Sequence, residues 1–158
     1  MPQLSLPIEG NASTLPKDDF KFKHSLRVRW GECDAQRIVF NAQYVNYIEV
    51  AQAEYFRNIG IAHYSDEVRA RFDLATVKAT LEFLAPVRID DMLDVYTRVS
   101  RIGNSSITFI TEMYIHGKNA PCNRAEGIYA NFDAATGVPR RVPDDIREAV
   151  RRFEGWEY

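Results

Sequence analysis

The sequence lacks the features that mark membrane, secreted and nucleic-acid-binding proteins. It contains no stretch of about 18 apolar residues, so we expect no transmembrane helix. Its amino terminus has no basic segment followed by an apolar one, and we therefore expect no secretory signal. The formal net charge is −2, whereas a nucleic-acid-binding domain favours a basic face. These absences predict a cytoplasmic protein with neither a membrane nor a nucleic acid as partner.

Cysteine and histidine are also scarce. Cys33 and Cys122 are the only cysteines, and one pair in a chain of 158 residues is a weak disulfide signal, so we expect free thiols. His24, His63 and His116 lie far apart and lack the spacing of metal ligands. A glycine-rich phosphate loop and a Gly-x-Ser-x-Gly nucleophile elbow are both absent. We therefore expect no metal site and no serine-hydrolase site.

The length and composition predict one globular domain. A chain of 158 residues is long enough for one ordinary domain and too short for two. With 46% hydrophobic residues, it can bury a core without disulfides or a metal. Residues 1–19 contain three prolines and no lasting periodicity, which predicts a flexible N-terminal tail. Residues 20–158 are predicted to form the single domain.

Five segments alternate apolar and polar residues with a period of two, which is typical of strands with one solvated face. The first runs from Phe20 to Trp30. The other four follow a helical segment and cover residues 77–86, 93–99, 107–115 and 125–132. Short turns at Gly103-Asn104 and His116-Gly117 separate the last three of them. We therefore expect an antiparallel meander.

A helical segment separates the first strand from the second. Asn41 is a predicted N-cap and Gly60 a predicted C′ residue. Apolar side chains with helical spacing form one broad face, made of Tyr44, Val45, Ile48, Ala51, Tyr55, Phe56 and Ile59. A short surface helix is predicted over residues 143–153. One long helix and one sheet make a two-layer α+β domain, in which the sheet curls around the helix or a partner chain completes the core.

The segment between the first strand and the helix carries a recognisable pattern. It reads RWGECDAQRIVFNAQY over residues 29–44, with Asp34 in a polar turn and an apolar triplet before the helix. Together with residues 82–86, 90–93 and 103–106, it resembles the signature of the 4-hydroxybenzoyl-CoA thioesterase branch of the hot-dog superfamily. The resemblance covers roughly residues 22–132.

The resemblance implies a hot-dog fold, in which an antiparallel sheet of five to six strands wraps around one long central helix. It implies hydrolysis of an aromatic or fatty acyl-CoA to the free acid and coenzyme A, with no cofactor apart from the coenzyme A of the substrate. Two chains of this family join their sheets, so the resemblance also implies a homodimer, or a homotetramer made of two dimers. The carrier of the acyl group, coenzyme A or an acyl carrier protein, stays open.

The resemblance assigns roles to two residues near the start of the helix. The turn aspartate of the family, here Asp34, acts as nucleophile or as general base for water. A backbone N–H at the start of the central helix, here that of Asn41, polarises the thioester carbonyl, because the first N–H groups of a helix lack intrahelical partners. The sequence departs from the family at Arg37, where glycine is common, and at Asn41, where many members have histidine or tyrosine. We expect Arg37 to reshape the turn or to place a cation near the substrate.

Several further residues are candidates for the site. Glu49 lies two turns into the helix, where it either borders the site or is a solvated helix charge. Phe40 and Tyr44 are candidates for binding the acyl group, although an aromatic residue spaced as Tyr44 is more often part of the core. The resemblance assigns the pantetheine arm to the tip of a predicted hairpin, which also needs no function to explain its composition: Asn104, Ser105 and Ser106.

Two other functions stay open. One is a hot-dog hydratase or dehydratase, which would need a histidine near the helix start, and none lies between Asp34 and Gly60. The other is a non-catalytic module that binds an acyl-CoA or a partner protein. Cys33 adjoins Asp34, but no local motif supplies a histidine to activate its thiol, so we do not assign it as the nucleophile.

Overall fold

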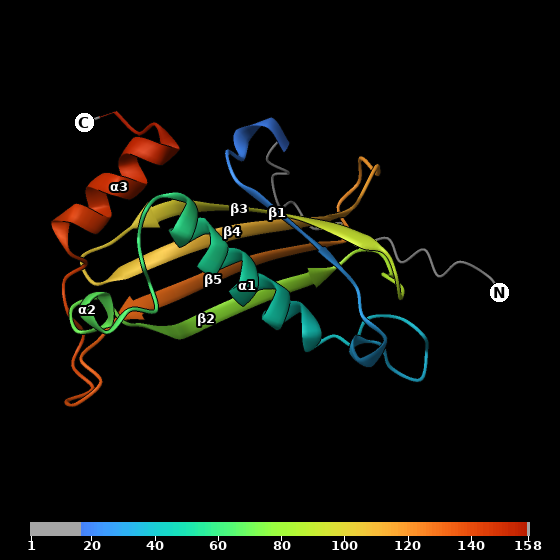
Figure 1. Ribbon diagram of the computed structural model, residues 1–158, viewed down its shortest axis with the longest axis horizontal. Coiled ribbons are helices and arrows are strands. Elements are labelled where there is room, and N and C mark those ends of the chain that lie inside the picture. The colour runs from blue at the N-terminus through green and yellow to red at the C-terminus, as the bar shows by residue number, and fades with distance from the viewer. Residues whose placement is uncertain (1–16, 158) are drawn as a thin grey trace.

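The computed structural model describes residues 17–157, which form one antiparallel sheet with a long helix across it (Figure 1). In this range the sheet has five strands in the order β1-β3-β4-β5-β2. The strands are β1 (Lys23–Arg27), β2 (Leu74–Phe83), β3 (Met92–Ile102), β4 (Ser106–Ile115) and β5 (Asn123–Asn131). The helices are α1 (Gln43–Asn58), α2 (Asp66–Arg69) and α3 (Asp144–Glu154), with 3₁₀ turns η1 (Lys17–Asp19) and η2 (Trp30–Glu32). The predicted α+β class and hot-dog arrangement are confirmed.

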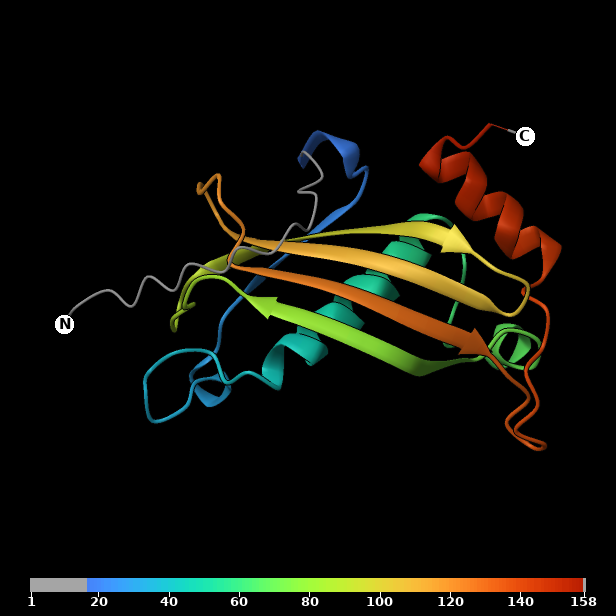
Figure 2. The ribbon, with the colours of Figure 1, turned by 180° about the vertical axis from the view of Figure 1, so that it is seen from behind.

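Helix α1 lies against one face of the sheet, as the front and back views show (Figures 1 and 2). Its buried side chains recur every three or four residues, at Tyr44, Tyr47, Ile48, Ala51, Tyr55 and Phe56. The helix ends in a Schellman motif, because the N–H of Gly60 donates to Arg57 C=O (3.1 Å) and the N–H of Ile61 donates to Phe56 C=O (2.9 Å). Gly60 has a φ of +81°, so the predicted C′ role of this glycine is confirmed.

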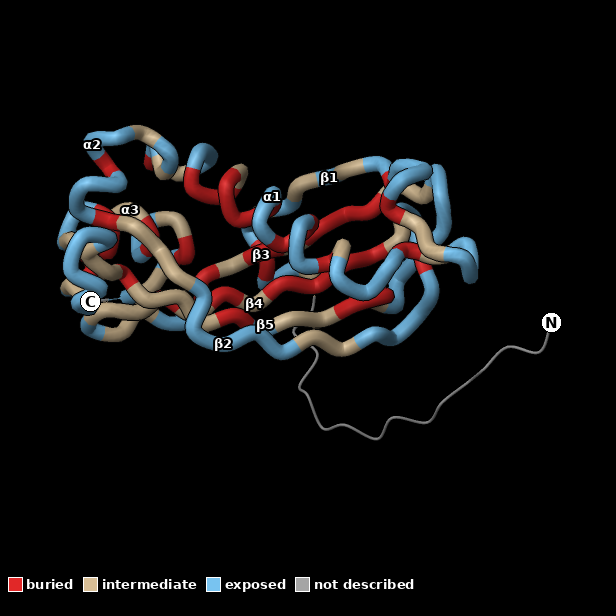
Figure 3. The backbone as a smooth tube through the Cα atoms, turned by 90° about the horizontal axis from the view of Figure 1, so that it is seen from below, coloured by how far each residue is buried: buried red, intermediate tan, exposed pale blue. Residues whose placement is uncertain are grey.

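The buried side chains form two clusters along α1, and β3 and β4 contain most of the buried residues of the sheet (Figure 3). The Tyr47 cluster packs under the first half of α1 and includes Val28, Val39, Tyr47, Leu93 and Met113. The Tyr55 cluster packs under the second half and includes Tyr55, Phe72, Phe109, Ile146 and Val150. Each cluster therefore joins one half of the helix to one end of the sheet.

The predicted alternation holds best in the central strands. Leu93, Val95, Thr97 and Val99 in β3 are all fully buried, as are Ile107 and Met113 in β4. The first strand is shorter than the predicted segment from Phe20 to Trp30, because the chain turns into η2 at Trp30. Trp30 is 83% exposed, so it does not continue the apolar face of the strand.

Strand β2 forms one edge of the sheet and is mostly exposed. It pairs with β5 on one side, and within residues 17–157 no strand pairs with its other side. A bulge between Thr76 and Lys78 interrupts the pairing at Val77, which is 65% exposed. Val77 begins the apolar alternation predicted over residues 77–86, but its side chain is not buried, because the extra residue of a bulge shifts the side-chain alternation.

The segments outside the sheet fit the prediction in part. Of the predicted tail, residues 1–16 lie outside the described residues, and Lys17 donates from Nζ to Lys118 C=O (2.7 Å). The predicted surface helix is confirmed as α3, which buries Ile146 and Val150. The sequence pattern did not predict α2, a single turn capped by the Ser65 side chain. No helix in the described part of the chain is long and apolar enough to cross a membrane.

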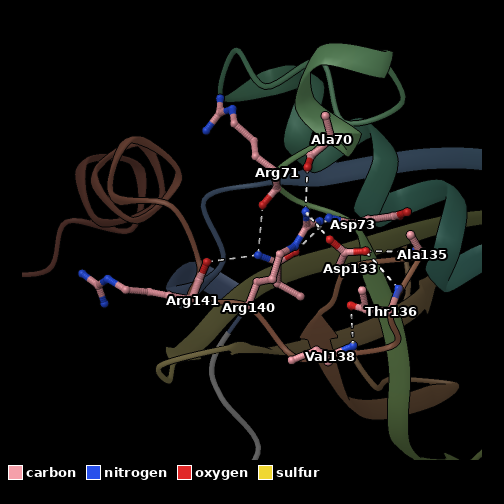
Figure 4. Close-up of polar contacts among 10 residues, drawn as sticks. Ala70, Arg71, Asp73, Asp133, Ala135, Thr136, Val138, Arg140 and Arg141 are labelled. Atoms are coloured by element: carbon pink, nitrogen blue, oxygen red, sulfur yellow. Dashed lines mark hydrogen bonds and ion pairs between the residues drawn. The ribbon is translucent and has the colours of Figure 1, made fainter.

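A polar network ties the segment before β2 to the segment after β5. The side chain of Asn131, which is fully buried, accepts from Asp73 N–H (2.9 Å) and donates to the carbonyls of Arg71 and Arg141 (3.1 Å each). Beside it, Arg140 donates to Ala70 C=O (2.6 Å), as Figure 4 shows. One amide side chain thus satisfies three backbone groups from two distant segments.

We expect Asn131→Ala to destabilise the fold by about 3 kcal/mol, because it leaves buried backbone groups without partners. The free energy of unfolding, from urea denaturation, measures this. Thr136→Ala, in the exposed turn nearby, is the control and should change stability by less than about 0.5 kcal/mol. Equal stability of the Asn131 variant and the wild type would show that water replaces the side chain.

Candidate active site

Asp34 lies in a tight turn that follows β1 and η2. The turn is closed by an antiparallel bridge between Cys33 and Val39, and the N–H of Asp34 donates to Ile38 C=O (2.9 Å). The Asp34 side chain is half-buried, and its Oδ1 accepts from Gln36 N–H (2.8 Å). Within residues 17–157, this is the one hydrogen bond to the carboxylate, so most of its acceptor capacity is free.

Arg37 occupies the sharpest point of this turn. Its φ is +62°, in the left-handed region that glycine adopts without strain, and its N–H donates to Asp34 C=O (2.9 Å). The side chain is exposed. This backbone conformation explains why a glycine would fit the position, as it commonly does in the family that the sequence resembles. The arginine adds a cation at the rim of the turn without changing the need for a positive φ.

Helix α1 begins one residue later than predicted. Ala42, and not Asn41, is the N-cap, and its dihedral angles (φ −66°, ψ −22°) are already helical. The N–H of Gln43 donates to Phe40 C=O (2.9 Å), which closes a turn over residues 40–43 where the helix begins. The predicted N-cap role of Asn41 was therefore wrong. Its side chain is exposed and makes no hydrogen bond within the described residues.

The backbone N–H groups at this helix start are free to bind a ligand. In the described part of the chain, the N–H groups of Asn41 and Ala42 make no hydrogen bond, and both residues are exposed. They lie at the positive end of the α1 dipole. Such donors can stabilise a negative charge that develops on a bound oxygen.

Glu32 is a buried carboxylate beside this turn that sequence reasoning missed. It is 6% exposed, and its Oε2 accepts from Tyr47 O–H (2.6 Å) and from Arg29 N–H (2.8 Å). Burial by itself would raise the pKa of Glu32, but the hydrogen bonds from Arg29 and Tyr47 outweigh it and lower the pKa. The residue is therefore ionised at neutral pH. No sequence pattern could have found it, because its partner on α1 lies 15 residues away.

The predicted candidate Glu49 lies away from the Asp34 turn. It is exposed and borders an open cavity of about 440 Å³ between the second half of α1 and the start of β2. The other lining residues include Gln52, Phe56, Leu74 and Tyr129. Burial raises the pKa of Tyr129, so its hydroxyl stays protonated at neutral pH. The structure therefore places Glu49 at a cavity and not beside Asp34.

The remaining candidates divide between the two ends of the sheet. Phe40 is 51% exposed at the Asp34 end, whereas Tyr44 is buried there against Phe83, with ring centroids 5.4 Å apart. The predicted hairpin tip follows β3 at the opposite end of the sheet. The 11 residues of β3, which separate the two ends, span roughly 35 Å. It is held there by Arg147 of α3, which donates to the carbonyls of Gly103 and Asn104. This tip contains the last three candidates: Asn104, Ser105 and Ser106.

The two cysteines are free thiols. Cys122 is buried, and burial raises the pKa of its thiol to about 11, so it is protonated at neutral pH. Cys33 is half-buried next to Asp34. Within residues 17–157, no cluster of three or more His, Cys, Asp or Glu side chains has the arrangement of a metal site.

Comparison with known proteins identifies the family. Residues 28–150 match the model of the thioesterase-like superfamily. The chain is 32% identical over 127 residues to the acyl-CoA thioester hydrolase YbgC of Escherichia coli, covering 79% of this chain and 92% of that protein. It superposes with a TM-score of 0.76 on a Thermus thermophilus thioesterase solved with coenzyme A and zinc, at 22% identity, covering 89% of this chain and 99% of that one. The family model and the similarity to YbgC show that this chain belongs to the thioesterase-like superfamily.

Proposed function

We propose that this protein is an acyl-CoA thioesterase, with Asp34 as nucleophile or general base and the N–H groups at the start of α1 as the oxyanion site. One observation carries the proposal. Within residues 17–157, the Asp34 carboxylate accepts one hydrogen bond, and the backbone N–H groups of Asn41 and Ala42, which follow it in the sequence at the start of α1, make none. Membership in the thioesterase-like superfamily and the likeness to the hydrolase YbgC support the same activity.

The chemistry follows from the two groups. The thioester carbonyl develops negative charge when a nucleophile attacks, and N–H groups of Asn41 and Ala42 would bind that oxygen. As general base, Asp34 takes a proton from water, the hydroxide forms the new C–O bond, and the C–S bond breaks to release the coenzyme A thiolate. As nucleophile, Asp34 first forms an acyl anhydride and releases the thiolate, and water then cleaves the anhydride. Neither route needs a metal or a redox cofactor.

Hydrolysis in oxygen-18 water tests for the nucleophile route. In a single turnover, water that cleaves an anhydride at the aspartyl carbonyl leaves its label in Asp34, which mass spectrometry of the protein detects. Label that enters the product alone fits the general base, and equally an anhydride that water cleaves at its acyl carbonyl.

We further propose that the enzyme is a homodimer joined through β2, or a tetramer made of two such dimers. Within residues 17–157, the outer edge of β2 pairs with no strand and Val77 is exposed on it, and such an edge is a template for pairing with a second chain. Next to it, Val45 of α1 is 49% exposed at the margin of the cavity. Pairing across this edge would cover both valines and extend the sheet.

Such a dimer would complete the site. The start of α1 packs on Phe83, the last residue of β2, whereas the cavity adjoins Leu74, the first one. An antiparallel pairing of β2 with its copy reverses these ends. It would bring the cavity of one chain, with Glu49 and the nearby 104–106 hairpin, towards the Asp34 turn of the other. The predicted substrate-binding residues would then meet across the subunit boundary.

The substrate is tested with a panel of acyl-CoA esters that carry aromatic, short and long acyl groups. We expect thiol release from at least one class, measured with a thiol reagent, and the ranking defines the acyl group. The same acyl groups on an acyl carrier protein test the carrier. Tight binding of an ester without thiol release would support a non-catalytic module instead.

A cytoplasmic location completes the proposal. The free thiols of Cys33 and Cys122 suit a reducing compartment. Fractionation of cells that express the full chain would test it.

A further inference from the structure

The Glu32 carboxylate takes no part in the proposed reaction, yet it makes more hydrogen bonds than Asp34. Besides Tyr47 O–H and Arg29 N–H, it accepts from Arg29 Nε (2.6 Å) through Oε1. Glu32 and Tyr47 are both buried, since Tyr47 is 3% exposed and Glu32 6%. A buried charge of this kind is held only when several donors surround it.

Glu32 joins the three segments that frame the Asp34 turn. Its backbone N–H donates to Arg29 C=O (3.1 Å), which closes η2 before the turn. Its backbone C=O accepts from Phe40 N–H (2.9 Å), which fixes the segment that returns from the turn. Its side chain binds Tyr47 in the second turn of α1. The turn itself makes few bonds to the rest of the chain, one being from Val39 N–H to Val87 C=O (2.8 Å).

We propose that Glu32 and Tyr47 are a positioning pair, which sets the Asp34 turn at the correct place relative to the start of α1. This inference rests on the proposed function, in which Asp34 and the free N–H groups act on the same thioester. Neither residue of the pair touches the substrate. The O–H of Tyr47 keeps its proton, because burial and the neighbouring Glu32 carboxylate both raise the pKa of Tyr47.

The helix offers a matched control at its other end. Tyr55 O–H donates to Glu154 Oε1 (2.7 Å), and both residues are buried. This second tyrosine–glutamate pair also docks α1, but it lies in the Tyr55 cluster, away from the Asp34 turn of its own chain, and neither residue lines the cavity. Tyr47→Phe and Tyr55→Phe therefore remove the same kind of bond from the same helix.

We expect Tyr47→Phe to lower kcat by about 10- to 100-fold and to change KM less than about threefold, because a small displacement of a reacting group is enough to slow turnover this much. Tyr55→Phe should keep kcat within about twofold. Both are assayed well below their melting temperatures with the best ester of the panel. Hydrogen–deuterium exchange of residues 33–42 gives a second readout, which should accelerate about tenfold in Tyr47→Phe only.

Glu32→Gln should act in the same direction, because its amide N–H groups would face the donors of Arg29. The double variant with Tyr47→Phe should be no slower than Glu32→Gln alone if the two residues act as a unit. Unchanged exchange together with a kcat within twofold of wild type in Tyr47→Phe would overturn the inference, as would equal losses in the two tyrosine variants. If Asp34→Asn kept full turnover, the proposed function would fail, and the exchange rates alone would decide whether the pair holds the turn.

Discussion

Asp34→Asn is expected to lower turnover of the best acyl-CoA ester by roughly 10³-fold or more, as for other groups that act directly in covalent or base catalysis. This corresponds to about 4 kcal/mol of lost transition-state stabilisation. The asparagine keeps an oxygen that can accept the hydrogen bond from Gln36 N–H, so the turn should persist. What is lost is the negative charge and the basicity of the carboxylate.

The control for this variant is Asp133→Asn. Asp133 Oδ1 accepts from Ala135 N–H (2.8 Å), two residues ahead, which is the same local arrangement as at Asp34. It lies in the turn after β5, and its substitution should leave turnover within about twofold. Activity of Asp34→Asn within a few-fold of wild type would remove Asp34 from the chemistry and end the proposed mechanism.

Val77→Glu is expected to dissociate the proposed dimer and to lower turnover by about 100-fold at low protein concentration. Val77 lies near the middle of β2, so an antiparallel pairing centred on this strand would bring two such glutamates close together. Like charges facing each other at an interface cost several kcal/mol. Because Val77 is 65% exposed in the single chain, the substitution should not disturb its folding.

Light scattering and a dilution series of activity measure this effect. Activity per chain should recover as the concentration of Val77→Glu rises, because association then restores the shared site. The control is Val50→Glu, an exposed valine of α1 that does not border the cavity. A monomeric variant with full turnover would show that one chain holds a complete site.

The order of the elements could be predicted from the sequence because each apolar pattern here reports a local contact. Leu93 and Val99 in β3 and Tyr55 in α1 point into the core, and their spacing alone indicates this. The limits of the elements were harder to predict. Trp30 continues the alternation of β1 in the sequence, but the chain has already turned into η2 at that point.

The site could be predicted only in part, because its arrangement depends on contacts that are distant in the sequence. The pattern around Asp34 indicates a turn before a helix, and the structure has one. The burial of Glu32 depends on Tyr47, and the position of Asn104 depends on how far β3 runs before it turns. The residues that the resemblance assigns to the site therefore lie partly at one end of the sheet and partly at the other, and no local pattern reveals this.

The division of the core into two clusters has a practical consequence for protein engineering. The Tyr55 cluster, with α3 packed on it, contains none of the groups proposed to act on the thioester. Affinity tags and fluorescent labels can thus be attached on the solvent-facing side of α3, for example at Arg151 or Arg152, which are exposed. Arg147 should be left unchanged, because it holds the 104–106 hairpin. The Tyr47 cluster should also be left intact when variants with a new substrate range are selected.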